Sequence, residues 1–481
     1  MYEKILDISK RRGIIYPSFE IYGGLSGFYD YGPIGSRIKN NIENLIRDYY
    51  LIDESCIEVQ CPTLSPEEVW IASGHVQNFT DIITECTKCG EPYRADHLIE
   101  EKTKETINLN LSEIQEILDK KNVRCPKCGS KLDKAYNYNL MFQTFVGPGK
   151  SKTLSYLRPE TAQTTYLAFR RLWEISRKKL PFGVLQIGHS YRNEISPRQG
   201  MIRLREFNQA EIQFFLDPNK KETERFNEVS DMELPIQPKD KDKPIKITLK
   251  EAVDKGIIKI QLIAYLLGKS FCLFKDMGID PNLLKLRQHL DTERSFYSSD
   301  TWDIEFMSKD FGRVELVGIA DRSDYDLSAH MKLSKQDFQI NVDNRKFVPH
   351  IVEVAYGIDR PLYCVLESCY REEDNRSYFK FPIEIAPYIV GVFPLVQKDG
   401  LPEKASSVLD KLKKDKMYAI YDEAGSIGKR YARADEIGIP YCITIDYQTL
   451  DDDTITVRDR DTKGQIRLRI DEITSYLCSK F

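Results

Sequence analysis

The sequence predicts an α+β fold. A large domain at residues 1–381 is built on an antiparallel sheet with helices, and an α/β domain follows at residues 382–481. Three observations support this prediction: a strand–loop–strand pattern at residues 182–215, two Cys–x2–Cys pairs within residues 84–140, and strands that alternate with helices after Pro382. The chain of 481 residues is too long for one compact core, so two or three domains are expected.

The composition is typical of a soluble protein of the cytoplasm. Charged residues make up 30% of the chain, apolar residues 41%, and the net charge is −4. No apolar run is long enough to span a bilayer, and the N-terminus lacks the apolar core of a secretory signal. We therefore expect a cytoplasmic protein without a membrane partner. The net charge neither favours nor excludes nucleic acid, since local basic faces attract phosphate.

The first 83 residues contain a glycine-rich segment, a helix and a strand. Five glycines at positions 23, 24, 27, 32 and 35 lie among aromatic residues. They serve either a close backbone approach to a ligand or a turn that packs its aromatic rings. Apolar residues at helical spacing predict a helix over residues 35–50, and residues 57–62 are typical of a strand that ends at Pro62.

Residues 84–140 are predicted to be an inserted zinc-knuckle module. The pairs Cys86/Cys89 and Cys125/Cys128 are each followed by glycine, with a polar helix expected between them at residues 105–121. This spacing turns backbone amides toward the sulfurs, and four thiolates make a closed tetrahedral Zn²⁺ site of the structural type. The alternative is four reduced cysteines that bind no metal.

The strand–loop–strand pattern at residues 182–215 has more arginine than a solvated hairpin needs. Its loop has turn signals at residues 196–197 and 199–200. Arginines at fixed places on a sheet suit bidentate binding of phosphate or carboxylate, and the alternative is a salt-bridged hairpin. The arginines are Arg192, Arg198, Arg203 and Arg205, interleaved with Glu194, Glu206 and Glu211.

Charged residues also mark the segments on either side of this hairpin. Residues 157–163 are expected to open a strong helix with Pro159 and Glu160 in its first turn. Residues 216–300 are dense in Lys, Asp and Glu, which predicts a second insert, a solvated surface module. A helix is expected from residue 357 to residue 366. Strands are predicted at residues 302–306, 313–322 and 351–356.

The tail after Pro382 has the pattern of a separate domain. Helices predicted at residues 404–414 and 427–437 alternate with strands such as residues 441–446. Strand–helix alternation implies a mostly parallel sheet with helical cover, and about a hundred residues suffice for an independent domain.

Arginines and carboxylates thus recur on the predicted strands, helix starts and loops of the larger domain. Together with the lack of a P-loop, they suggest a triphosphate held on an antiparallel sheet, with Mg²⁺ bound through a carboxylate such as Glu315. The further arginines are Arg322 and Arg360, and the carboxylates are Glu160, Glu194, Glu211, Glu315 and Glu353.

These motifs resemble those of the class II aminoacyl-tRNA synthetases. FGVLQIGHSYRNE and RLREFNQAE resemble the second signature of that class, GIDR at 357–360 the third, and IEVQCPTLSP at 57–66 the first. LRPETAQ, ADRSDYDL and the tail DEAGSIGKRYARADEIGIPYCITID are similar to the homodimeric glycyl-tRNA synthetases. The resemblance covers nearly the whole chain apart from much of residues 216–300. It implies a class II catalytic domain at residues 1–381 and an anticodon-binding domain at residues 382–481.

The resemblance implies ATP-dependent activation of glycine to glycyl-adenylate and transfer of glycine to the 3′-terminal ribose of tRNA-Gly. The first step needs no protein nucleophile, because the glycine carboxylate attacks the α-phosphorus in line while arginine and Mg²⁺ spread the charge. The implied partners are ATP, glycine, tRNA-Gly and a second copy of the chain at an interface that includes Pro62, with no DNA. Mg²⁺ and a structural Zn²⁺ are the implied cofactors.

The implied catalytic residues are Arg192, Glu315 and Arg360. Arg192 would hold the α-phosphate, Arg360 the γ-phosphate, and Glu315 would carry Mg²⁺. Glu194 would accept from the adenine amino group while Phe207 stacks on the ring. The remaining implied ATP contacts are Arg203 or Arg205, at the β- and γ-phosphates, and Leu316.

The implied glycine site is rich in carboxylates. The ammonium would lie among Glu160, Glu211 and Glu353, and Arg322 would neutralise the carboxylate. Every competing amino acid is larger than glycine, so a tight pocket rejects it by clash without an editing site. The family has Glu-Pro-Ser where this chain has EVA at 353–355, and the hydroxyl missing at Ala355 is worth about 0.5–1.5 kcal/mol. Weaker glycine binding is therefore expected. Arg158 is the remaining implied contact.

Three other interpretations fit parts of the sequence. QIGH at 186–189 and KLSK at 332–335 resemble the signatures of class I synthetases, but that class needs its first signature after the opening strand of a Rossmann domain. A nonenzymatic synthetase-like RNA-binding protein would have lost residues such as Arg192 and Arg360, which are present. A class II synthetase for another small amino acid is disfavoured by the three carboxylates, although Ala355 departs from the glycine pattern.

Overall fold

A computed structural model describes residues 1–103, 110–197, 199–295, 297–373 and 376–480. Arg198 and residues 105–109 of the helix expected at 105–121 lie outside this part of the chain. None of the helices formed by the described residues is long and apolar enough to cross a membrane.

A nine-stranded sheet forms the centre of the larger domain, in the order β13-β12-β14-β15-β16-β19-β11-β10-β3. Neighbouring strands are antiparallel except for β12/β14 and β10/β3, so the expected antiparallel sheet is confirmed. The hairpin predicted at residues 182–215 is its β10/β11 pair. The strands are β3 (Ile57–Val59), β10 (Phe182–Tyr191), β11 (Glu206–Leu216), β12 (Glu233–Gln237), β13 (Ile245–Thr248), β14 (Leu284–Gln288), β15 (Asp300–Ser308), β16 (Gly312–Ser323) and β19 (His350–Gly357).

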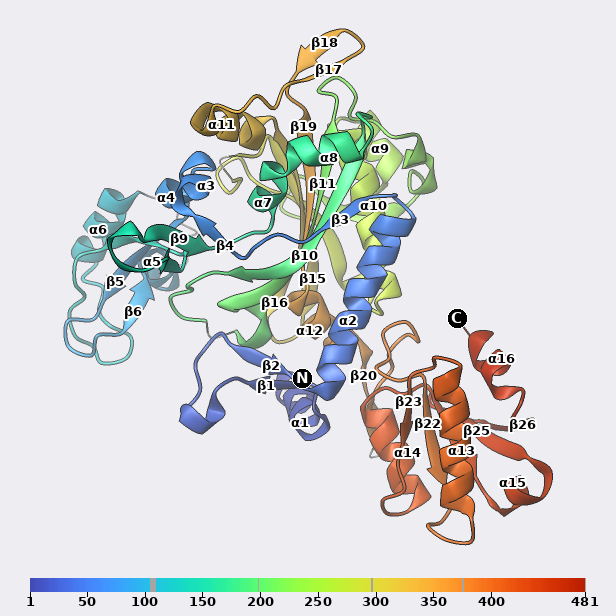
Figure 1. Cartoon of the computed structure of the whole chain (residues 1–481). Coiled ribbons are helices and arrows are strands. Elements are labelled where there is room, and N and C mark those ends of the chain that lie inside the picture. Colours follow the sequence, from blue (N-terminus) through green and yellow to red (C-terminus); the bar gives the residue numbers. More distant parts are fainter. Residues whose placement is uncertain (104–109, 198, 296, 374–375, 481) are drawn as a thin grey trace.

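The two faces of this sheet are covered differently (Figure 1). On one face α2 (Pro33–Arg47), α10 (Gln261–Asp276) and α12 (Asp359–Cys369) pack against side chains such as Ile212 and Val354. On the other face α7 (Ala162–Leu167), α8 (Phe169–Ile175) and α11 (Tyr325–Ser334) pack near Phe215 and Ile351. Side chains alternate along a strand, so the odd-numbered residues of β11 and β19 point to this second, partly open face.

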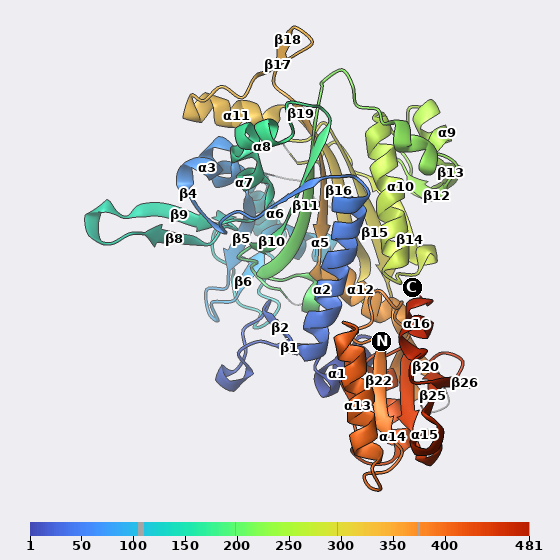
Figure 2. The ribbon, with the colours of Figure 1, turned by 45° about the vertical axis from the view of Figure 1, so that its right-hand side comes forward.

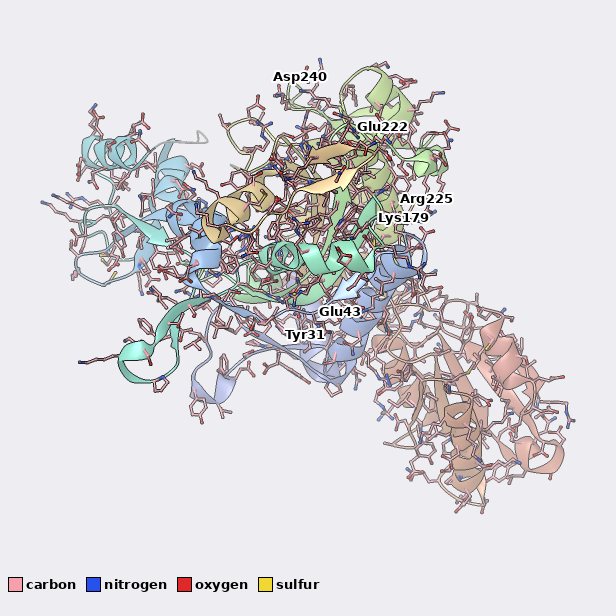
Figure 3. The ribbon with its side chains drawn as sticks, turned by 45° about the horizontal axis from the view of Figure 1, so that its top comes forward. Tyr31, Glu43, Lys179, Glu222, Arg225 and Asp240 are labelled. Carbon is pink, nitrogen blue, oxygen red and sulfur yellow. The ribbon has the colours of Figure 1, made fainter. Side chains whose placement is uncertain are left out.

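Residues 216–300 are not the solvated surface module that their charges predicted. β12, β13 and β14 extend the nine-stranded sheet, and twelve of the sixteen residues of α10 are buried. Charged residues such as Glu222 and Asp240 are exposed on the outer side of the segment (Figure 3). The apolar side chains of α10 fill the space under β15 and β16, which is why this segment belongs to the core. The segment also contains α9 (Leu249–Asp254).

The helix expected from residue 157 begins later and is broken. α7 starts at Ala162, so Pro159 and Glu160 precede it, and Ala168 separates α7 from α8. Glu160 does not lie in the first turn of a helix, as expected, but forms buried contacts with Arg322 and His75. The helix expected at 35–50 is α2 followed by a single π-turn at Asp48–Ile52.

The cysteine-bearing insert forms a small module beside the main sheet. Its strands pair in the order β6-β5-β7, and α5 and α6 pack over them around Ile99 and Ile114. A long hairpin, β8–β9, projects nearby and pairs with β4 (Figure 2). The bounds are β4 (Leu64–Pro66), β5 (Thr80–Glu85), β6 (Pro92–Arg94), α5 (Ala95–Thr103), α6 (Leu111–Lys120), β7 (Tyr136–Asn139), β8 (Gln143–Val146) and β9 (Thr153–Leu157).

The C-terminal part folds around its own five-stranded sheet, β23-β22-β24-β25-β26. β22, β23 and β24 are parallel as expected, whereas β25 and β26 are antiparallel. A short link joins β25 to β26, and such a link can connect only antiparallel strands. The elements are β22 (Val390–Pro394), α13 (Leu401–Lys414), β23 (Ala419–Tyr421), α14 (Ile427–Glu436), β24 (Tyr441–Ile445), α15 (Tyr447–Asp452), β25 (Thr454–Asp459), β26 (Gln465–Arg469) and α16 (Ile473–Cys478).

This C-terminal part packs against the start of the chain (Figures 1 and 2). Arg12 pairs with Glu436, and the side-chain amide of Asn41 donates to Ala386 O at 2.9 Å. The remaining elements are α1 (Tyr2–Arg12), β1 (Ile15–Pro17), β2 (Tyr29–Tyr31), α3 (Glu67–Ala72), α4 (His75–Asn78), β17 (Ile340–Val342), β18 (Arg345–Phe347), β20 (Tyr370–Glu373) and β21 (Arg376–Phe379).

Candidate active site

A pocket of about 300 Å³ opens on the second face of the main sheet. Its floor comes from the odd-numbered residues of β11 and β19. Its walls come from β16, from the β10–β11 loop and from His289, Ser295, Tyr297 and Thr301. Most of the predicted site residues line it. They are Glu160, Arg192, Glu194, Arg203, Phe207, Glu211, Glu315, Glu353, Ala355 and Arg360.

Glu315 reaches this pocket because β16 contains a β-bulge. Ile304 pairs with Val317, but the next residue of β15, Glu305, pairs with Glu315, so Leu316 is an extra residue. A bulge re-aims the side chains that follow it, and here it brings Glu315 to the same face as Gly318. Leu316 itself is 1% exposed in the hydrophobic core, so the side chain predicted to contact ATP points away from the pocket.

Cationic and aromatic side chains meet at the loop end of the pocket. The Arg192 guanidinium lies 5.2 Å from the centre of the Phe207 ring, and its Nε donates to Pro159 O at 3.3 Å. Arg205 is committed elsewhere: its Nε and Nη2 donate to Glu194 O at 3.0 and 2.8 Å. Of the two arginines expected at the β- and γ-phosphates, Arg203 lines the pocket and Arg205 holds the backbone of the loop.

Arg360 forms an ion pair with Glu315 at the β16 wall of the pocket. Its Nη1 donates to Glu315 Oε2 at 3.2 Å and its Nε to Ile202 O at 3.0 Å. Burial alone would raise the pKa of Glu315, but Arg360 and His289 hold it below its usual range. The neighbouring Asp359 accepts from Asn208 N at 2.6 Å, which fixes the start of α12 to β11.

Three carboxylates line the inner end of the pocket, and a buried arginine that does not line the pocket binds two of them. Arg322 is 0% exposed and donates from Nη1 to Glu353 Oε1 at 3.1 Å, while its Nη2 lies 3.4 Å from Glu160 Oε1. Its Nε donates to Asp326 Oδ2 at 2.7 Å. Glu211 accepts from Thr161 Oγ1 at 2.7 Å. Arg322, predicted to meet the substrate carboxylate, therefore organises the acidic cluster in this structure.

The pKa values of these carboxyls diverge although they share one cluster. Burial, followed by the negative charges of Glu353 and Glu160, raises the pKa of Glu211 to about 8. Burial alone would also raise the pKa of Glu160, but Arg322 and His75 lower it well below its usual range. The pKa of Glu353 is raised, chiefly by burial. The cluster therefore carries less negative charge at neutral pH than its residues imply, and it suits a cationic ligand that draws Glu211 into its ionised form.

Several residues of this cluster were missed by sequence reasoning. Gln163 Nε2 donates to Glu160 Oε1 at 2.9 Å, and His75 Nε2 lies 3.6 Å from Glu160 Oε2. Asp326 stands four residues after Arg322 at the start of α11, a spacing that could have indicated the pair. Tyr297 lies under the Arg322 guanidinium at 3.7 Å, and no sequence pattern pointed to it.

A second polar pair on the pocket wall was also missed. His289, which directly follows β14, and Asp303 of the neighbouring strand β15 approach to 2.5 Å between Nε2 and Oδ2. Burial, with the charge of Glu315, raises the pKa of Asp303 to about 6, and Asp303 raises that of His289 above its usual value. Both lie beside Glu315, so this wall offers carboxylate oxygens suited to a divalent cation.

Arg158 is buried beneath the pocket and does not line it. Its Nη1 donates to Gln186 Oε1 at 2.9 Å and its Nε to His189 O at 2.8 Å. A Cβ at Gly188 would lie 2.3 Å from Arg158 Nη2, so a larger residue there would displace the guanidinium from its present position. The sequence predicted that Arg158 contacts glycine. In the structure Arg158 instead links β10 to the backbone at Cys61, because its Nη1 also donates to Cys61 O. Ala355 does line the pocket.

The four predicted cysteines converge in the insert. Their sulfurs lie within 4.8 Å of one another, and Cys86 Sγ and Cys89 Sγ lie 3.4 and 3.7 Å from Cys128 Sγ. The amides of Lys88 and Cys89 donate to Cys86 Sγ at 3.4 Å. Four thiolates around Zn²⁺ at about 2.3 Å would be separated by about 3.8 Å, so this cluster can hold a metal ion.

Comparison with known proteins agrees with this architecture. Residues 149–369 match the family described as "tRNA synthetase class II core domain (G, H, P, S and T)", and residues 390–480 match "Anticodon binding domain". Solved prolyl-tRNA synthetases share the fold. The enzyme from Cryptosporidium parvum has a TM-score of 0.60 at 13% identity, covering 99% of this chain and 74% of that one. The Giardia lamblia enzyme has a TM-score of 0.59 at 16% identity, with 99% and 78% covered. The chain thus has the core of a class II aminoacyl-tRNA synthetase.

Curated relatives narrow the class to one family. The glycine–tRNA ligase of Methanocaldococcus jannaschii is 44% identical over 99% of this chain and 98% of its own length. That of Thermococcus sibiricus is 42% identical over 99% and 98%, and that of Methanothrix thermoacetophila 41% over 98% and 95%. The chain belongs to the glycine–tRNA ligase family, so it is a class II ligase. The class I alternative is excluded, because QIGH lies within β10 of an antiparallel sheet.

Proposed function

We propose that the pocket binds ATP and glycine and forms glycyl-adenylate, from which glycine passes to the 3′-terminal ribose of tRNA-Gly. The observation that supports it best is that Glu160, Glu211 and Glu353 line the same pocket as Arg192, Glu315 and Arg360. One end is acidic and buried, as an ammonium requires, and the other carries arginines, as phosphates require.

The acidic cluster provides the glycine subsite. The ammonium of glycine lies among the three carboxylates. Arg322 maintains the orientation of Glu353 and Glu160 through its bonds to them, and Thr161 donates to Glu211. Glycine has no side chain to bind, so the affinity comes from its charged ends. Ala320 and Ala355 line the pocket together with Glu160, Glu211 and Glu353, and these three glutamate side chains occupy the space around the α-carbon of the bound glycine. Larger amino acids are rejected by clash.

The opposite end provides the ATP subsite. Phe207 stacks on adenine, Glu194 accepts from its amino group, and Arg192 holds the α-phosphate as the glycine carboxylate attacks it. Arg203 contacts the β- and γ-phosphates and Arg360 the γ-phosphate. Glu315 presents a carboxylate that fits Mg²⁺, a hard cation that binds oxygen, and the ion would neutralise phosphate charge when bound. No side chain acts as a nucleophile.

The four cysteines hold a structural Zn²⁺. The convergence of the four sulfurs within 4.8 Å of one another and the amide bonds to Cys86 support a closed site without an open coordination position. The metal stabilises the module, whose own core around Ile99 and Ile114 is small. None of the eleven cysteines, all of which lie in the described part of the chain, forms a disulfide, which supports a reducing compartment, the cytoplasm.

The chain divides into a catalytic domain at residues 1–381 and an anticodon-binding domain at residues 382–481, and it acts as a homodimer with Pro62 at the interface. The separate sheet of β22–β26 and the matched residues 390–480 support the division. Exposed apolar side chains on the β8–β9 hairpin, Phe145 at 52% and Val146 at 45%, support a protein interface. Light scattering on the purified chain tests the dimer, and a monomeric mass would contradict it.

The reaction is tested by charging tRNA. The purified chain, ATP, Mg²⁺ and labelled glycine should esterify a tRNA-Gly transcript, and Arg360→Ala should abolish this activity. Charging with serine or alanine in place of glycine would identify a ligase for another small amino acid. Binding of tRNA without ATP-dependent charging would identify an RNA-binding protein without the enzymatic activity.

A further inference from the structure

A loop near the N-terminus exposes four large apolar side chains. In the loop at residues 18–28, Phe19 and Leu25 are each 52% exposed, Tyr22 is 85% exposed and Ile21 is 88% exposed. Single exposed apolar residues are ordinary on a protein surface, but four on one short loop mark a contact surface. Figures 1 and 2 both show this segment, in blue between β1 and β2, projecting away from the main sheet.

The backbone of the 18–28 loop is closed by its own hydrogen bonds. Gly24 N donates to Phe19 O at 3.0 Å, and Ser18 N donates to Phe28 O at 3.1 Å. Phe19 has φ of 62°, a left-handed conformation uncommon for a residue with a side chain, and Gly23 has φ of 91°. Such a conformation persists where the surroundings maintain it, and here it directs the side chains of Ile21 and Tyr22 outward.

This loop is attached to the loop that borders the pocket. Arg205 N donates to Gly27 O at 2.8 Å, and Arg205 Nη1 donates to Ser26 O at 3.0 Å. A Cβ at Gly27 would lie 2.8 Å from the Pro197 side chain, so only glycine permits this approach. Since Arg205 also binds the backbone of Glu194, one arginine joins the exposed loop to a residue that lines the pocket.

We propose that the 18–28 loop binds the unpaired 3′ end of tRNA and guides its terminal ribose into the pocket. The proposal rests on the proposed function, since the second step requires that end to reach the adenylate beside Arg192. A single strand that enters the pocket beside Arg192 would pass the β10–β11 loop at the pocket border. The 18–28 loop is bonded to this border through Arg205.

The chemistry of the loop fits unstacked bases. Tyr22 and Phe19 present rings on which bases stack, Ile21 and Leu25 add apolar contact, and Arg205 supplies a positive charge close to the loop for the phosphates. Stacking of this kind does not distinguish one base from another. It therefore suits a terminal sequence that must be positioned, while the anticodon is read elsewhere.

The test compares two reactions of the same enzyme. Ile21→Ala/Tyr22→Ala should lower kcat/KM for charging tRNA-Gly by roughly 5- to 100-fold, the range expected for loss of base stacking. Glycine-dependent ATP–pyrophosphate exchange should stay within about twofold of wild type, because the loop does not line the pocket. Tyr22→Phe keeps the ring and should retain charging. Ile175→Ala, which truncates a side chain 62% exposed at the end of α8, is the matched control.

A tRNA without its last three nucleotides locates the contact. Wild type should bind this shortened tRNA more weakly than the intact one, and the double variant should bind both equally weakly. The proposal would be overturned if shortening the tRNA lowered the affinity of wild type and of the double variant by the same factor. It would also be overturned if the double variant charged tRNA-Gly as efficiently as wild type. A double variant that charges poorly because it becomes monomeric would show instead that the loop contacts a second copy of the chain. If wild type shows no glycine-dependent exchange, the proposed function itself fails.

Discussion

Replacing Glu211 by glutamine isolates the charge of one carboxylate in the glycine subsite. Glutamine has nearly the same shape, and its side-chain oxygen can still accept from Thr161 Oγ1, now at 2.7 Å from the Glu211 oxygen. What is lost is the ionised partner of the ammonium. A hydrogen bond to a charged group contributes about 1.5–3 kcal/mol, so the KM for glycine should rise by roughly 10- to 150-fold.

The assay is ATP–pyrophosphate exchange as a function of glycine concentration. The KM for ATP should stay unchanged, because Glu211 lies at the end of the pocket opposite Glu194 and Arg203. Glu206→Gln provides the control, since Glu206 stands on the same strand but outside the pocket. A glycine KM for Glu211→Gln that equals that of wild type would remove Glu211 from the ammonium site and refute the reasoning.

Three further predictions follow from the same residues. Before glycine binds, Glu211 is largely protonated at neutral pH because its pKa is about 8, and an ammonium beside it favours the ionised form. The affinity for glycine, measured by calorimetry, should therefore rise from pH 6 to pH 8 in wild type. In Glu211→Gln the affinity should not change with pH. The raised pKa also means that wild type loses stability as pH rises from about 4.5 toward 8. Between pH 5 and pH 8, the free energy of unfolding of Glu211→Gln in urea should therefore increase relative to that of wild type by on the order of 3–4 kcal/mol. An equal pH dependence of the unfolding free energy in the two proteins would contradict the raised pKa. Metal analysis should find about one zinc per chain, Cys86→Ser should lose it and unfold at a lower temperature, and a native chain without zinc would disprove the metal site.

The main features of the sheet were predictable because their signals are local. The hairpin at 182–215 follows from strand periodicity and turn residues, and alternation then brings Phe207, Glu211 and Glu353 to one face. The Cys–x2–Cys spacing likewise brought four sulfurs together. In each case, neighbouring residues determine the geometry.

Other parts of the structure depend on contacts between distant segments. The charges near residue 240 suggested a surface module, although α10 and β14 in the same segment are core elements. The bulge that turns Glu315 into the pocket and buries Leu316 depends on the register of β15 against β16, which leaves no local pattern. Arg158 and Arg322 were expected at the substrate. Their partners distant in sequence, His189 O for Arg158 and Glu353 for Arg322, come from the tertiary packing.

The central claim is that an acidic pocket on the antiparallel sheet activates glycine. It is tested most directly by ATP–pyrophosphate exchange with the purified chain and a single added amino acid. Glycine should support rapid exchange, whereas alanine and serine should support little, since each adds atoms at the α-carbon beside Glu160, Glu211 and Glu353. Absence of exchange with glycine, or faster exchange with alanine or serine, would contradict the account.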